Sequence, residues 1–167
     1  LIAVITSLFL LGFSHKKWFF NLSFITLVNI SITGIIFHLL LTPYISKIDI
    51  LQHVLHTSNP IFYVLYFLIF IPKFLPPKAF WIGLIYPLIY MIFVYLFFEP
   101  FLGDLLEIAS PNFESARYVY PFLDPAQYDS GYMGLAFFNL GLIAPIILIY
   151  TYILTLIKRK FELKLTS

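Results

Sequence analysis

Long apolar runs alternate along the chain with short polar stretches that contain prolines and charges. The runs cover residues 1–13, 18–41, 50–71, 80–98 and 133–157. A helix that crosses a bilayer needs about 20 mainly apolar residues, and the last four runs approach or exceed this length. The first run is too short and is interpreted as the end of a helix that starts upstream. The pattern predicts an all-α fold, a polytopic transmembrane helical bundle with five visible segments.

Prolines mark the predicted ends of three runs: Pro43 ends the second, Pro72 the third and Glu99-Pro100 the fourth. The stretch 99–132 is then a long loop, and connections above about 12–15 residues are uncommon in compact domains. Inside it, residues 101–108 are predicted to form a short interfacial helix. The whole chain, 1–167, is predicted to be a single transmembrane bundle.

Composition supports lipid as the solvent. The chain is 61% hydrophobic and 11% charged, whereas soluble domains have about 45–50% apolar and about 25% charged residues. The absence of cysteine excludes disulfides, thiolate catalysis and zinc sites built on Cys. No glycine-rich phosphate loop or repeat is present. We therefore expect membrane lipids as partners, with no cofactor, no metal and no nucleic acid.

The basic residues predict an orientation, because five segments place successive loops on alternate sides. One side then carries eight basic residues: Lys16, Lys17, Lys73, Lys78, Lys158, Arg159, Lys160 and Lys164. The other carries only Lys47 and Arg117, together with most of the acidic residues. By the positive-inside rule the first side is cytoplasmic. The prediction is a protein of the plasma (inner) membrane, with a cytoplasmic C-terminus and an external loop 99–132.

Polar residues cluster early in the third segment, where they are costly in lipid and suggest function. His53 and His56 are three residues apart and share one face of a helix. They lie near the helix N-terminus, where a neutral imidazole is favoured and can act as a general base. Pro60 has no N–H, so the carbonyl of His56 loses its usual helical partner and the helix is expected to kink or loosen.

Alternative interpretations of these polar residues stay open. The histidines can serve only as hydrogen-bonding groups between helices. With His38 on the second segment and Asp49, they could instead form a zinc site of nitrogen and oxygen ligands. Thr26 and Thr33 lie on one stripe of the second segment, a pattern typical of a helix–helix contact.

A proline-rich stretch in the outer loop supplies further candidates. Pro121 and Pro125 stiffen it, Tyr120 can dip into the membrane interface, and Asp124 could orient a histidine. The other interpretation is a rigid interfacial turn with a solvated Asp124.

Two motifs resemble those of the androgen-induced-gene family of membrane proteins. Its Asn-His-x-x-His-Thr signature is similar to Gln52-His53-Val54-Leu55-His56-Thr57. Its Val-Tyr-Pro-Phe-Leu-Glu stretch is similar to Tyr118-Val119-Tyr120-Pro121-Phe122-Leu123-Asp124. The resemblance covers nearly the whole chain and is greatest to a bacterial branch of six-helix proteins, so six helices are expected in the full protein.

The resemblance implies a hydrolase of fatty-acid esters that uses a Thr nucleophile and a His base on separate helices. The catalytic histidine corresponds to His56, and the family's Thr would precede Leu1. Thr26 is the best substitute within the chain, although it lies on a different segment. Gln52 stands where the family has Asn, which is a departure from the motif.

The leading hypothesis is an intramembrane hydrolase of fatty-acyl esters in which a Thr hydroxyl attacks the ester and His56 is the base. His53, Thr57, Asp124 and Tyr120 would support or orient these groups. The alternative is a non-enzymatic membrane protein, either a small transporter or a lipid-binding scaffold. A metal-dependent enzyme is a third possibility.

Overall fold

The computed structural model describes residues 2–42, 48–71, 77–111 and 115–165. Within these ranges the regular structure is helical and contains no strand, so the predicted all-α fold is confirmed. Pro43 and Pro72, the predicted ends of two segments, lie outside the described residues.

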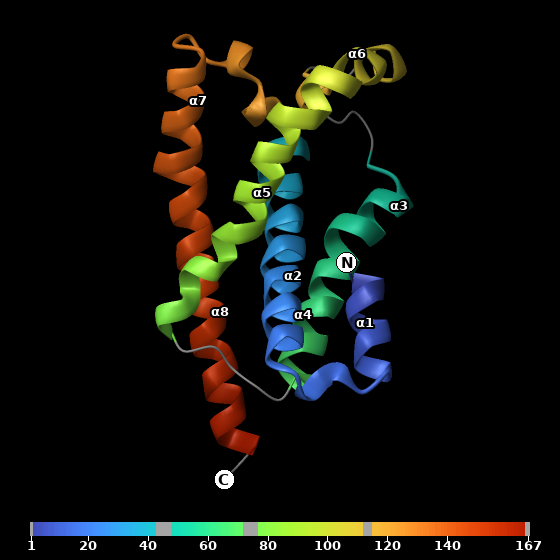
Figure 1. Ribbon diagram of the computed structural model, residues 1–167, viewed down its shortest axis with the longest axis vertical. Coiled ribbons are helices and arrows are strands. Elements are labelled where there is room, and N and C mark those ends of the chain that lie inside the picture. Colours follow the sequence, from blue (N-terminus) through green and yellow to red (C-terminus); the bar gives the residue numbers. More distant parts are fainter. Residues whose placement is uncertain (1, 43–47, 72–76, 112–114, 166–167) are drawn as a thin grey trace. The chain divides into compact units, whose positions relative to one another are not determined.

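Helices α1 to α8 follow one another along the chain (Figure 1). Their bounds are α1 Ile2–Leu10, α2 Lys17–Ile36, α3 Ile50–His53, α4 Asn59–Phe70, α5 Ile85–Phe93, α6 Glu99–Ala109, α7 Tyr132–Phe138 and α8 Ala144–Leu165. Wide π-helical turns either extend one of these helices or join two of them into a longer continuous helix. These turns are Phe37–Leu41, Val54–Ser58, Val94–Phe98 and Asn139–Ile143.

Four of the continuous helices are long and apolar enough to cross a membrane. They are Lys17–Leu41, Ile50–Phe70, Phe80–Ala109 and Tyr132–Phe161. Many of their large apolar side chains are exposed, as expected for surfaces that face lipid rather than water. Their length, composition and exposed apolar surface are those of an integral membrane protein.

The π turns have a common position in the sequence, because each ends two residues before a proline. Pro60, Pro100 and Pro145 follow three of them, and Pro43 follows the fourth in the sequence. A proline inside an α-helix removes one N–H and its ring clashes with the carbonyl four residues earlier. A wider turn relieves both problems without ending the helix. The expected loosening of the helix at Pro60 is therefore confirmed.

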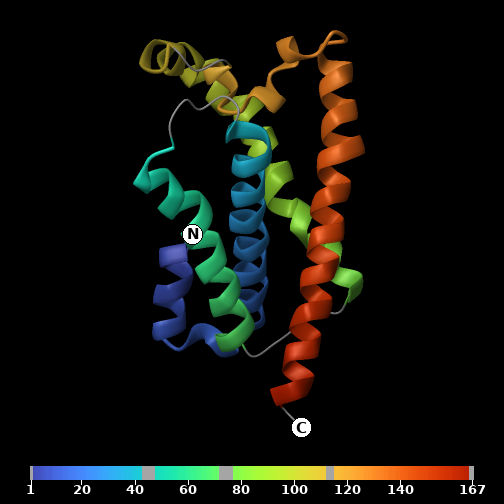
Figure 2. The same ribbon diagram turned by 180° about the vertical axis from the view of Figure 1, so that it is seen from behind.

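The fourth segment does not end at Glu99-Pro100. After the Val94–Phe98 turn the helix continues as α6 to Ala109, with Pro100 in its first turn, where a missing N–H costs little. Figures 1 and 2 show α6 turning away from the direction of α5. The predicted interfacial helix 101–108 thus lies within α6, and the predicted loop 99–132 begins with eleven helical residues.

Contacts divide the chain into two compact units, residues 1–83 with 148–167, and residues 84–147. In the first unit α2 packs along α4 (Figures 1 and 2), and aromatic rings fill the contact. Phe67 of α4 lies between Phe20 and Phe24 of α2, with both pairs of ring centroids 5.8 Å apart. All three rings are buried, so this contact is a large source of packing energy in the unit.

Lys158 of α8 also belongs to the core of the first unit. It is buried, its Nζ donates a hydrogen bond to the Leu68 carbonyl at 3.0 Å, and it lies 5.6 Å from the centre of the Phe67 ring. The residue four positions after Leu68 is Pro72, which has no N–H to offer that carbonyl. The ammonium group thus supplies a donor at the C-terminal end of α4, where the helix dipole also favours positive charge.

In the second unit, hydrogen bonds from Tyr95, Tyr128 and Asn139 hold the segment that connects α6 to α7. Short 3-10 helices occupy this segment at Ala116–Tyr118, Pro121–Leu123 and Pro125–Gln127. Tyr95 donates a hydrogen bond to the Leu123 carbonyl, and Tyr128 and Asn139 donate to the carbonyl of Phe122 at 3.0 and 3.3 Å. The predicted outer loop is therefore ordered where the structure describes it.

Candidate functional site

An open groove of about 510 Å³ runs along the first unit, within the range of about 300–1,000 Å³ usual for small-ligand sites. The groove is lined by residues of α2 and α4, of the π turns Phe37–Leu41 and Val54–Ser58, and by Tyr150 of α8. The walls are mainly apolar, and Leu39, Ile61 and Leu65 are exposed along them. Such a groove suits a hydrocarbon chain better than a polar metabolite.

Five polar side chains line the same groove: Ser31, His38, His56, Thr57 and Tyr150. The Nε2 atom of His38 and the Oγ1 atom of Thr57 are 2.9 Å apart and share a hydrogen bond between two helices. Either atom can donate, depending on the tautomer of the imidazole. A hydroxyl paired with an imidazole is the arrangement by which hydrolases activate a nucleophile.

The His56 ring is held by stacking. It lies nearly parallel to the Phe37 ring, at an interplanar angle of 7° and a centroid separation of 4.1 Å. Its Nδ1 atom is buried and has no hydrogen-bond partner among the described residues. Buried polar atoms are nearly always paired, so an unpaired one needs an explanation.

Backbone geometry brings these groups together. His38 lies in the π turn Phe37–Leu41, whereas His56 and Thr57 lie in the turn Val54–Ser58. Single π turns within α-helices are frequently found at functional sites. Gly34 permits the close approach, since a Cβ at this position would lie 2.8 Å from the His56 carbonyl oxygen and 3.0 Å from Cγ of Pro60.

The sequence-predicted residues have different places in this unit. His56 and Thr57 line the groove, but His53 is exposed and does not line it. Thr26, the suggested substitute nucleophile, is buried, and its hydroxyl donates to the Leu22 carbonyl of its own helix at 2.9 Å. It does not line the groove, and its hydroxyl already has a partner.

The alternative of a zinc site has no support in the geometry. Across the described ranges, no three His, Asp or Glu side chains lie close enough together to hold a metal ion. Asp49 instead caps helix α3: its Oδ1 accepts a hydrogen bond from the Gln52 backbone N–H at 2.7 Å. The Gln52 side chain returns the bond by accepting from the Asp49 N–H at 3.0 Å.

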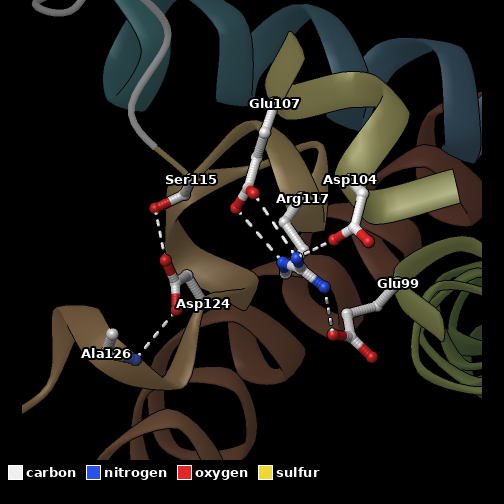
Figure 3. Close-up of polar contacts among 7 residues, drawn as sticks. All are labelled: Glu99, Asp104, Glu107, Ser115, Arg117, Asp124 and Ala126. Atoms are coloured by element: carbon white, nitrogen blue, oxygen red, sulfur yellow. Dashed lines mark hydrogen bonds and ion pairs between the residues drawn. The ribbon is translucent and has the colours of Figure 1, made fainter. Parts of the chain in front are cut away.

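Tyr120 and Asp124 belong to the second unit, so their support of the histidines stays a prediction. The Asp124 carboxylate accepts hydrogen bonds from the Ser115 hydroxyl at 2.6 Å and the Ala126 N–H at 2.8 Å (Figure 3). It thereby caps the 3-10 helix Pro125–Gln127. The Tyr120 ring stacks on Phe122, with centroids 5.2 Å apart.

In the same unit, Arg117 contacts three carboxylates of α6, a cluster that the sequence did not predict (Figure 3). Its guanidinium bonds Glu99 at 3.0 Å, Glu107 at 3.1 Å and Asp104. Hydrogen bonds to Glu107, Glu99 and Asp104 raise the pKa of Arg117 above its ordinary value. Gly103 lies against the stem of Arg117, where a Cβ would be 2.8 Å from Cγ. The cluster fastens the segment after α6 to that helix.

The pairing of His38 with Thr57 is the feature that sequence reasoning missed. The sequence suggested His38 only as a possible zinc ligand, because spacing along one helix does not specify which faces of two helices meet. The available signal was Gly34, a glycine four residues before His38 that permits a close helix approach.

Comparisons with protein-family models, with curated proteins and with solved structures found no match for this chain.

Proposed function

We propose that this membrane protein binds a fatty-acyl ester in the groove of the first unit and hydrolyses it. The observation that carries the proposal is the position of two imidazoles and the Thr57 hydroxyl on the wall of a mainly apolar groove. The apolar walls suit the acyl chain, and the polar trio would face the ester. Acyl transfer requires a nucleophile and a proton acceptor, and both are present.

The resemblance to the androgen-induced-gene family supports the same reaction class. It assigns the role of base to His56, which lines the groove. The orientation expected from the basic residues would place the groove towards the external side, with the C-terminus in the cytoplasm. A substrate with a buried chain could then enter sideways from the lipid, because the groove is open.

A non-enzymatic lipid-binding scaffold is the second candidate. The mainly apolar lining favours this candidate, because an apolar groove can bind a lipid without any catalytic side chain. The two candidates agree that the groove holds an acyl chain and differ in whether the ester is cleaved.

The test is the release of fatty acid from a long-chain ester by the purified protein in lipid nanodiscs. Val64 lines the groove, and Val64→Trp should block it and abolish both ester binding and release. Ile69→Trp is the matched control, since Ile69 is exposed on the same helix and does not line the groove. Binding without release would favour the scaffold, and equal activity in both variants would contradict the proposed site.

A further inference from the structure

We propose that Thr57 is the nucleophile of this site and that His38, not His56, is the base that activates it. This inference rests on the proposed hydrolase function and assigns its reacting atoms. The pair is defined by one contact, 2.9 Å between Thr57 Oγ1 and His38 Nε2, within hydrogen-bond reach for proton transfer. The chain would then carry its own nucleophile.

The other threonines near this site are less suited to attack. The hydroxyls of Thr26 and Thr33 both donate to carbonyls four residues earlier in α2, each at 2.9 Å. Thr57 differs because its hydroxyl pairs with an imidazole on another helix and lines the groove. It is thus a hydroxyl beside both a base and a space for an acyl chain.

The reaction balances with an ester and water as reactants. Thr57 Oγ bonds to the ester carbonyl carbon while its proton passes to His38 Nε2. The carbon–oxygen bond to the alcohol then breaks, and the alcohol leaves with the proton from His38. Water attacks the acyl-threonine, again giving a proton to His38, and release of the fatty acid returns the proton to Thr57.

His56 has a different part in this scheme. The buried Nδ1 atom of His56 has no hydrogen-bond partner among the described residues. Buried N–H donors without a partner are rarer in proteins than buried acceptors without one, so Nδ1 is assigned the lone pair and not the proton. The proton is then on Nε2, where it can donate to the ester carbonyl oxygen as negative charge develops there. Stacking on Phe37 fixes the ring for that role. This assignment makes His56 a donor, whereas the family resemblance makes it the base.

The test uses a long-chain alkyl fluorophosphonate on the purified protein in nanodiscs, with peptide mapping by mass spectrometry. Attack forms an oxygen–phosphorus bond and releases fluoride. The wild type should carry the adduct on Thr57, Thr57→Ala should lose it and Thr57→Ser should keep it. Thr33→Ala is the matched control and should label like the wild type, because the Thr33 hydroxyl is bonded within its own helix.

The two histidines are separated by the pH dependence of the labelling rate. His38→Gln should slow labelling by at least about 100-fold and remove the rise in rate between about pH 5 and 8 that an imidazole base gives. His56→Gln should be slower than the wild type but keep that rise. The reverse assignment of the pH dependence would overturn the role given to His38.

The outcomes also separate this inference from the function on which it rests. Ester hydrolysis that persists in Thr57→Ala, or an adduct on another residue, would overturn the assignment of the nucleophile and leave the hydrolase proposal standing. A wild-type protein that neither hydrolyses esters nor takes the label would overturn both.

Discussion

In the first unit, the polar side chains that line the groove carry imidazoles and hydroxyls, whereas in the second unit one guanidinium gathers three carboxylates. His38 and Thr57 pair through a single hydrogen bond between two helices that are long and apolar enough to cross a membrane. Arg117 and its partners are partly exposed, from 27% for the Glu99 side chain to 85% for Asp104. The charges of the Arg117 cluster thus lie where solvent reaches them.

The difference follows from the cost of charge in a low-dielectric medium. An ionised group in lipid loses its hydration, so polar groups there are tolerated when they are neutral and paired. Exposed ion pairs keep much of their hydration, but each one stabilises the fold only weakly. A cluster of three pairs therefore stabilises it more than any single pair. Chemistry is therefore expected at His38, His56 and Thr57, and a structural role at the charged cluster.

The largest effect is expected from Gly34→Leu in the first unit. The new Cβ would lie 2.8 Å from the His56 carbonyl oxygen, a backbone atom that cannot rotate away. Separating α2 from α4 should cost about 3 kcal/mol, the upper end of overpacking penalties. Thermal unfolding in detergent measures this loss. Gly141→Leu is the control, since a Cβ there meets nothing within 4 Å.

A smaller loss is expected from Lys158→Met, which keeps the apolar stem but removes the donor to the Leu68 carbonyl. An unsatisfied buried acceptor should cost about 2 kcal/mol. The exposed Lys160→Met in the same helix is the matched variant. Equal melting temperatures for the two variants would remove the role assigned to Lys158.

Arg117→Ala tests the second unit. It leaves three carboxylates facing one another without a cation, so the melting temperature should fall at low salt. The difference from wild type should shrink at high salt, because screening weakens exposed charges, while the effect of Gly34→Leu should not change. If Arg117→Ala lowered the melting temperature equally at low and high salt, the proposed contrast between an exposed charged cluster and a buried helix contact would be contradicted.

The pH dependence of the same cluster has a definite sign. A folded-state pKa that is raised, as for Arg117, gives stability that is present below the unfolded pKa and is lost only as the pH rises through the folded one. Because guanidinium stays charged to above about pH 12, the Arg117→Ala difference should be the same at about pH 7 and 10.

The smallest effect is expected from Asp124→Ala. It removes the cap of the 3-10 helix Pro125–Gln127 and the partner of Ser115. Loss of such a cap typically costs about 1 kcal/mol. Hydrogen exchange of the Ala126 amide, whose N–H donates to the Asp124 carboxylate, measures the local change. Unchanged protection of that amide would show that the cap is unimportant.

Much of the fold could be predicted from the sequence, because apolar runs of bilayer length specify membrane helices with little ambiguity. The loosening at Pro60 was also predictable from the missing N–H. The end of the fourth segment was predicted wrongly, since a π turn at Val94–Phe98 lets the helix accommodate Pro100 and continue.

The site was less predictable. His56 and Thr57 were identified from one segment, where spacing along a helix is known. Their relation to His38 depends on how two helices pack, and that is determined by Gly34 and two π turns acting together. The Arg117 cluster was missed for the same reason, because its partners come from residues 10 to 18 positions away.

The most direct test is to locate a bound acyl chain with a fatty-acyl ester that carries a diazirine near the ester end of its chain. After irradiation in nanodiscs, we expect adducts on Ile61, Val64 or Leu65 that are competed by unlabelled ester and lost in Val64→Trp. Adducts spread evenly over other exposed apolar side chains, such as Phe62 and Phe137, and not competed by ester, would contradict a lipid site in this groove.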